Sequence, residues 1–142
     1  MGPPDKPPIG LVVTRTAKAL NRAFERALGG AGGSQPVWLI LLALKSQPGS
    51  TQRRLAEELG IREATMTHHL NGMEQAGLVT RRRDPNNRRV HQVTVTEDGE
   101  ILFERLRAAA LAFDLRLRSG ASDGQLDQLT ETLQRLADNA SP

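Results

Sequence analysis

The fold of this chain is decided by residues 51–95, which read TQRRLAEELGIREATMTHHLNGMEQAGLVTRRRDPNNRRVHQVTV. The first part predicts two short helices, residues 51–59 and 62–75, separated by a break at Gly60. Two β-forming runs follow, residues 78–83 and 90–95, on either side of the turn formers Asp84-Pro85-Asn86-Asn87. This order predicts a helix-turn-helix followed directly by a β-hairpin, the wing.

The flanking residues are predicted to be helical. Apolar spacing indicates a helix over residues 10–28, an apolar central helix from Ser34 to about Lys45, and two helices after Thr96. Residues 1–9 hold four of the eight prolines and are predicted to form a disordered arm. We therefore expect a mainly α fold with a small β-hairpin, in one domain over residues 10–142. Residues 34–96 would form its winged helix-turn-helix lobe, between terminal helical parts at 10–33 and 97–142.

Composition excludes several classes of function. The chain has no cysteine, which excludes disulfides, thiolate metal sites and thiol nucleophiles, and it contains no nucleotide-binding or hydrolase motif. His68 and His69 are adjacent, so they do not face each other on a helix, and His91 lies apart on the hairpin. We expect neither an enzyme nor a metal or cofactor site. The N-terminus has no signal-peptide pattern and no apolar run approaches ~20 residues, so we expect a cytoplasmic protein without a membrane partner.

The hairpin carries the strongest functional signal. Five arginines and one aspartate lie between Arg81 and Arg89. Folding alone does not require like charges so close together, whereas an anionic partner such as DNA explains them. Side chains alternate between the faces of a strand, so Arg81 to Arg83 cannot all contact one partner. The better candidates lie at or just past the tip, and these are Asn86, Arg88 and Arg89.

The second short helix is the candidate recognition helix. Met66, Leu70 and Met73 are spaced to form its buried face. The opposite side of its N-terminal half would then approach base edges in the major groove of DNA. The DNA-contacting residues predicted there are Arg62, Thr65, Thr67 and His68, together with Thr51 and Gln52 at the start of the preceding helix.

Several pieces of the sequence, in order and at these spacings, resemble the MarR family of bacterial transcription regulators. The pieces are Leu55-Ala56-Glu57-Glu58-Leu59 with Ile61, Thr65-Met66-Thr67, Met73-Glu74, Gly77-Leu78-Val79, Arg82-Arg83-Asp84-Pro85, Arg88-Arg89 and Val95-Thr96-Glu97-Asp98-Gly99. The resemblance implies a homodimer with interlocking terminal helices that binds a pseudo-palindromic DNA operator. We favour a repressor, and an activator is the alternative, because the sequence does not give the sign of regulation.

The resemblance also implies a small-molecule effector site between the dimerisation helices and the DNA-binding lobe. Trp38, His69 and Phe103 are the candidates for it, and a role as ordinary core residues is the alternative for each. A second function class stays open, in which the winged helix is a protein-interaction module and the wing binds an acidic partner. Steep salt dependence and sequence preference of duplex binding would favour the DNA-binding class.

Overall fold

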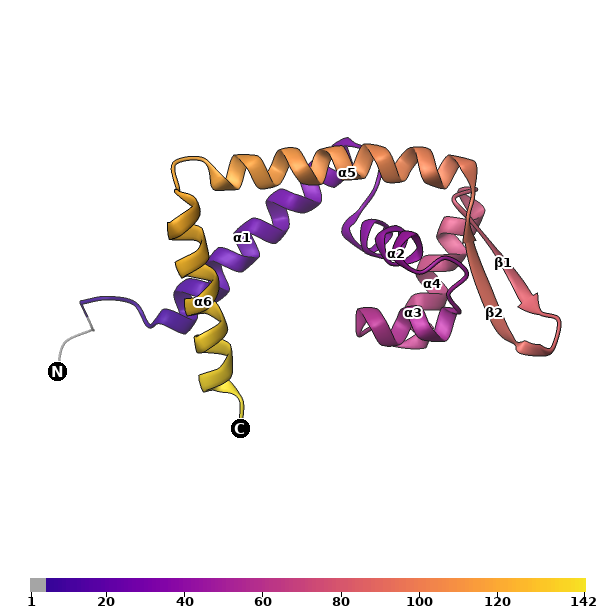
Figure 1. Ribbon diagram of the computed structural model, residues 1–142, viewed down its shortest axis with the longest axis horizontal. Coiled ribbons are helices and arrows are strands. Elements are labelled where there is room, and N and C mark those ends of the chain that lie inside the picture. Colours follow the sequence, from indigo (N-terminus) through magenta and orange to yellow (C-terminus); the bar gives the residue numbers. More distant parts are fainter. Residues whose placement is uncertain (1–4) are drawn as a thin grey trace. The chain divides into compact units, whose positions relative to one another are not determined.

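The computed structural model describes residues 5–142, except the side chains of Arg88 and Arg89. It confirms the predicted mainly helical fold with one antiparallel hairpin (Figure 1). The elements are α1 (Ile9–Gly30), α2 (Gln35–Ser46), α3 (Gln52–Leu59), α4 (Glu63–Gln75), β1 (Val79–Asp84), β2 (Asn87–Val95), α5 (Glu97–Arg118) and α6 (Asp123–Ala140). The chain divides into a first compact unit ending at Ala110 and a second one, Leu111–Pro142, with the boundary inside α5.

The core of the first unit collects apolar side chains from α1 to α4, from the wing and from the first half of α5. Met66, Leu70 and Met73 are all buried, which confirms the predicted inner face of the second short helix. Burying a side chain of this size contributes roughly 1.5–3 kcal/mol before entropy is counted. The largest fully buried side chains are Leu28, Ile40, Leu41, Leu55, Met66, Leu70, Leu106, Val79 and Val93.

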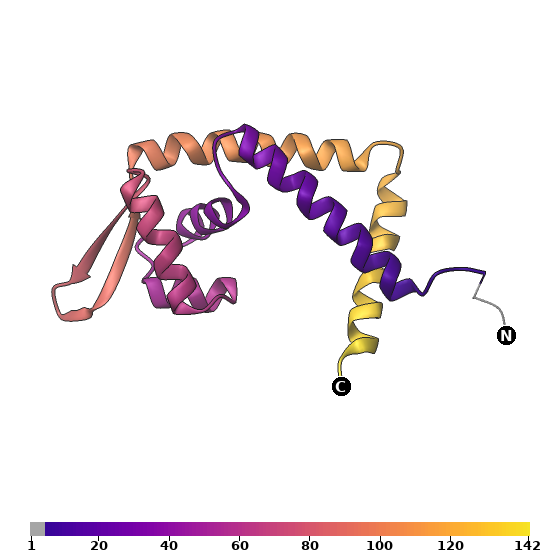
Figure 2. The same ribbon diagram turned by 180° about the vertical axis from the view of Figure 1, so that it is seen from behind.

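Local capping fixes the helix-turn-helix. The Thr51 hydroxyl accepts the Arg54 N–H at 3.1 Å, so Thr51 is the N-cap of α3. Gly60 ends α3 in the left-handed conformation, φ 65°, and the Ile61 N–H donates to the Ala56 carbonyl at 3.0 Å. Helix α4 begins at Glu63, one residue later than predicted, with Arg62 as its N-cap residue but without a side-chain cap bond. Helices α3 and α4 pack beside each other in both views (Figure 2).

The wing is longer than the sequence predicts. Val79 pairs with Val95, and the register continues to Arg83 opposite His91 before it shifts to pair Asp84 with Asn87. The Asp84 carboxylate accepts the Asn86 N–H at 2.8 Å, which tightens the turn and leaves only residues 85 and 86 outside the strands. Asn87, predicted as part of the turn, is therefore the first residue of β2.

The base of the wing is tied to the start of α3. The Val93 N–H donates to the carbonyl of buried Ser50 at 3.1 Å, and Thr51 forms an isolated antiparallel bridge with Gln92. Thr51 is also the N-cap of α3. The first turn of α3 and the middle of β2 are thus held together through the backbone.

The terminal helices bury few side chains. Helix α1 begins at Ile9, inside the predicted arm, and continues over Gly29 and Gly30, where the sequence predicts its end. Residues 1–4 of that arm lie outside the described residues. Leu28 is fully buried, which holds the last turn in place despite the glycines. Within the described part of the chain, no single helix is long and apolar enough to cross a membrane; α1 and α2 pass that test only together, and they meet at 75°.

The second unit contains the end of α5 and all of α6. Ser122 and Gln125 form a reciprocal capping box that starts α6. No residue of α6 is buried, and Leu129 and Leu133 are 51% and 41% exposed. With Leu126 and Leu136, these leucines repeat at the spacing of one helix face. The chain therefore folds α6 as an amphipathic helix whose apolar stripe is only partly covered.

Candidate nucleic-acid interface

The N-terminal half of α4 presents polar side chains outward. Arg62, Thr65 and His68 are exposed, whereas Thr67 is half-buried on the side that faces α3. Glu63 lies in the first turn, where a carboxylate interacts favourably with the helix dipole. His68 also lines a cavity of about 500 Å³ with residues of the second half of α4 and with Val37. The predicted DNA-contacting residues of α4 therefore split between two sides of the helix.

Gln52 and Thr67 are joined directly. The Gln52 Nε2 group donates to Thr67 Oγ1 at 2.5 Å, and Thr67 Oγ1 donates to the Glu63 carbonyl at 2.9 Å. Both side chains are half-buried. Two residues predicted separately as DNA contacts thus form one hydrogen-bonded unit between the helices of the helix-turn-helix.

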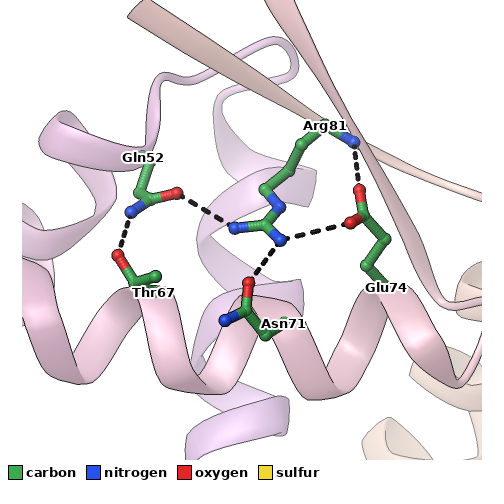
Figure 3. A network of polar contacts seen from close by, with 5 residues as sticks. All are labelled: Gln52, Thr67, Asn71, Glu74 and Arg81. Atoms are coloured by element: carbon green, nitrogen blue, oxygen red, sulfur yellow. Dashed lines mark hydrogen bonds and ion pairs between the residues drawn. The ribbon is translucent and has the colours of Figure 1, made fainter.

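Arg81 extends this unit to the wing (Figure 3). Its Nη1 group donates to Gln52 Oε1 at 3.5 Å, and its Nη2 group donates to Asn71 Oδ1 at 2.5 Å and to Glu74 Oε1 at 3.1 Å. The Arg81 backbone N–H also donates to Glu74 Oε2 at 3.1 Å. Only 15% of the Arg81 side chain is exposed, so this arginine is used inside the lobe.

Asn71, Glu74 and the role of Arg81 were missed by sequence reasoning. Strand alternation shows that some arginines of residues 81–83 must turn away from a partner, but it does not show which one does. The available signal was the spacing of Thr67, Asn71 and Glu74, which are four and three residues apart and therefore share a face of α4. That face meets β1, where Arg81 lies.

Arg81 also changes the acid strength of Glu74. The hydrogen bond from the Arg81 side chain is the main reason that the pKa of the Glu74 carboxyl lies below its ordinary value of 4.5; partial burial opposes this effect, while the Arg81 N–H and charge add to it. Glu74 is therefore a carboxylate at neutral pH and balances the charge of Arg81.

A cavity of about 430 Å³ opens between the start of α3, the start of α4 and the wing. It brings the predicted residues Thr51 and Gln52 together with side chains of β2 that were not predicted. Arg82, Arg83 and Asn86 are exposed on the wing, while the side chains of Arg88 and Arg89 lie outside the described residues. The cavity is lined by Thr51, Gln52, Arg53, Glu63, Asn87, Val90 and His91.

The three candidate effector residues occupy two different places. Trp38 and Phe103 stack on each other with ring centroids 5.5 Å apart and planes inclined by 16°, and Lys45 lies over the Phe103 ring. Phe103 is buried in the core. His69 lines a cavity of about 450 Å³ with apolar residues of α2 and α3, including Leu39 and Leu59.

Within the part of the chain that the structure describes, no cluster of three or more potential metal ligands occurs.

The helix-turn-helix and most of the wing match the MarR family, whose profile covers residues 34–91. Over these residues the chain is similar to the MarR family of transcription regulators. An HTH-type transcriptional repressor of Mycobacterium tuberculosis is 27% identical over 136 residues, which cover 96% of this chain and 98% of the relative. The organic hydroperoxide resistance transcriptional regulator of Bacillus subtilis is 30% identical over 90 residues, 63% of this chain and 61% of the relative.

Solved structures of MarR-family regulators share this fold. The transcriptional repressor CouR bound to a 23-mer DNA duplex superposes with a TM-score of 0.82 and 25% identity, covering 92% of each chain. CouR of Rhodococcus jostii bound to p-coumaroyl-CoA has a TM-score of 0.73 and 28% identity over 91% of each chain. These MarR relatives are regulators of transcription rather than enzymes.

Proposed function

We propose that this chain is a MarR-family regulator, which controls transcription by binding a specific duplex DNA sequence. The observation that carries the proposal is the exposed polar face of Arg62 and Thr65 on α4, together with a wing whose strand β1 exposes Arg82 and Arg83. Helix α4 would enter the major groove, with Arg62, Thr65, Thr67 and His68 near base edges. Thr51 and Gln52 would contact the adjoining backbone or base edge from the start of α3.

The wing would follow the DNA backbone. Arg82, Arg83, Arg88 and Arg89 leave the hairpin strongly basic even after Arg81 is paired with Glu74. Asn86, Arg88 and Arg89 lie at or directly after the turn, where a side chain reaches farthest from the lobe. An arginine inserted there into a narrow minor groove meets the strongest negative potential of the duplex.

The active form is proposed to be a homodimer. Leu111 and Leu115 at the end of α5 are 53% and 71% exposed, and Leu129 and Leu133 in the stripe of α6 are also exposed. A monomeric protein rarely leaves so many large apolar side chains on neighbouring turns uncovered. A second copy would cover them with its own identical helices, and two-fold symmetry would then place two α4 helices on a pseudo-palindromic operator.

Repression with release by a small molecule is the proposed mode of regulation. The M. tuberculosis relative and CouR are named repressors, and CouR has been solved with p-coumaroyl-CoA. In this chain the cavity beside His69 offers apolar surface for such a ligand, and the Trp38–Phe103 pair offers aromatic surface at a second place. A cysteine-based response to hydroperoxides is excluded because the chain has no cysteine.

The decisive experiment is selection of bound duplexes from a random pool by the purified full-length chain in a bacterial cytosol-like buffer. We expect one pseudo-palindromic sequence to be enriched, with half-sites spaced by about one helical turn, ~34 Å, or a multiple of it. Affinity for the selected duplex should fall steeply with salt. Absence of any enriched duplex would overturn the proposal and favour a protein-interaction module.

A further inference from the structure

The hydrogen-bond chain from the wing to α4 has a fixed direction. It runs from Arg81 Nη1 to Gln52 Oε1, from Gln52 Nε2 to Thr67 Oγ1, and from Thr67 Oγ1 to the Glu63 carbonyl (Figure 3). We call this chain the relay. A guanidinium group has only donors and a backbone carbonyl has only acceptors. Both ends of the relay therefore impose the same direction on the two side chains between them.

Gln52 is the link whose orientation this direction decides. If its amide were turned over, the NH₂ group would face the guanidinium, donor against donor. The Asn71 carbonyl oxygen and the Glu74 carboxylate hold the other edge of the guanidinium, so Arg81 cannot rotate away without losing both bonds. The Gln52 amide thus keeps its oxygen toward β1 and its nitrogen toward α4.

The relay limits what the two side chains can offer to a third group. The Gln52 nitrogen has two hydrogens and Thr67 uses one, so Gln52 retains a donor while its oxygen is turned to Arg81. The Thr67 hydroxyl spends its only hydrogen on the Glu63 carbonyl, which leaves one lone pair and the methyl group. Toward a ligand, Gln52 is a donor and Thr67 is an acceptor or an apolar contact.

From this geometry we infer that Arg81 is a specificity-determining positioning residue, which acts through Gln52 and Thr67 without contacting the DNA itself. The inference rests on the proposed function. A glutamine recognises adenine by using its oxygen and nitrogen together on one base edge. The relay withholds the oxygen, so the native chain selects acceptor groups next to Gln52 and does not use it to select adenine.

The test compares the duplexes that the native chain and an Arg81→Gln variant select from a random pool. Glutamine at residue 81 can still bond to Asn71 and Glu74, but it can present either a donor or an acceptor to Gln52. For the Arg81→Gln variant, the expected change is confined to the one or two base pairs per half-site nearest Gln52. There the base preference of the native chain should weaken by roughly threefold to tenfold, which is the effect of one hydrogen bond. Adenine should be selected more often at these base pairs.

Two further variants separate polarity from charge. Arg82→Gln removes the same charge from an exposed neighbour on β1, so it should select the native half-site and alter only affinity and its salt dependence. Arg81→Lys keeps a group that only donates, so it should restore the native preference. The Arg81→Gln variant should keep the native salt dependence, because the Arg81 side chain is only 15% exposed and is bonded inside the lobe, where it neutralises no phosphate.

The outcomes are distinct. A native chain that enriches no duplex defeats the proposed function. If the native chain and the Arg81→Gln variant select the same half-site, with base preferences within twofold at every base pair, the inference is overturned. The proposed function then still stands. If thermal denaturation shows that the Arg81→Gln variant is unfolded, the Gln52→Met variant takes its place in the test. It cuts the relay and leaves the Arg81–Glu74 pair intact. That variant should lose preference at the same base pairs, and an unchanged preference overturns the inference.

Discussion

The carbonyl oxygen of Leu78 lies so close to the α-carbon of Gly99 that a β-carbon at residue 99 would overlap it. The same β-carbon would come within 2.7 Å of Val95 Cγ1. The Leu78 carbonyl accepts the Thr96 N–H at 3.0 Å, and the Thr96 hydroxyl accepts the Gly99 N–H at 3.1 Å. The junction between the wing and α5 is therefore built on backbone contact, which only glycine permits.

Gly99→Ala should destabilise the chain. The added methyl group has to push apart backbone atoms that are hydrogen-bonded, so we expect a loss of about 1–3 kcal/mol in the free energy of unfolding, as for other overpacked sites. Denaturant unfolding followed by circular dichroism measures it. Gly72→Ala is the matched control, because nothing lies within 4 Å of a β-carbon there and alanine favours the helix by up to about 1 kcal/mol. Equal stability of the two variants would contradict this account.

The Arg81–Glu74 pair should make stability depend on acidic pH. Arg81 lowers the pKa of Glu74 in the folded chain below the ordinary value of 4.5. The carboxylate therefore contributes stability that is complete above the unfolded pKa and is lost as pH falls through the lower folded pKa. We expect Glu74→Gln to be less stable than the native chain at pH 7, with the difference shrinking below about pH 4.5. Unfolding curves across this pH range test whether the stability difference shrinks as the pH falls. Glu58→Gln, at an exposed glutamate, is the control.

Leu115→Glu should separate the proposed dimer into monomers. A carboxylate placed in an apolar interface loses its hydration without gaining a partner, which should weaken dimerisation by roughly tenfold or more. Sedimentation at several protein concentrations measures the dissociation constant. Ile101→Glu changes an exposed apolar residue in the first part of α5 and should leave it unchanged. A native chain that sediments as a monomer at micromolar concentration would contradict the dimer directly.

Arg89→Ala should lower the affinity for DNA and make that affinity less dependent on salt concentration. Each arginine that neutralises one phosphate contributes about one unit to the slope of log affinity against log salt. A dimer with two tip arginines should therefore lose about two units, with the base preference preserved if the contact is to phosphate. Binding measured at several salt concentrations checks this, and exposed Arg105→Ala on α5 is the control for net charge. Identical slopes for Arg89→Ala and the native chain would show that the tip arginine is not used.

The fold was predictable wherever local chemistry and packing agree. Apolar spacing identified Met66, Leu70 and Met73, and the capping residues Thr51 and Ser122 marked helix starts because their hydroxyls satisfy free N–H groups. The end of α1 was wrong by two residues, because burial of Leu28 outweighs the helix-breaking tendency of Gly29 and Gly30.

The candidate site was predictable as a surface but not as a network. The basic wing and the polar half of α4 are visible in the sequence, since charge and helical spacing are local properties. The contacts of Arg81 with Gln52 and Asn71 join residues 29 and 10 positions apart. They depend on the strand register and on the angle at which β1 meets α4, and neither is encoded in a local pattern.

The stack of Trp38 on Phe103 has a practical consequence, since Trp38 is the only tryptophan and the chain has no tyrosine. Fluorescence excited near the red edge of protein absorption therefore comes only from the Trp38 indole. This indole is held between α2 and α5, and the Lys45 ammonium lies over the Phe103 ring. Its emission is a label-free optical probe of that junction. A compound that separates the two rings would shift the signal, whereas one bound only at the wing would leave it unchanged.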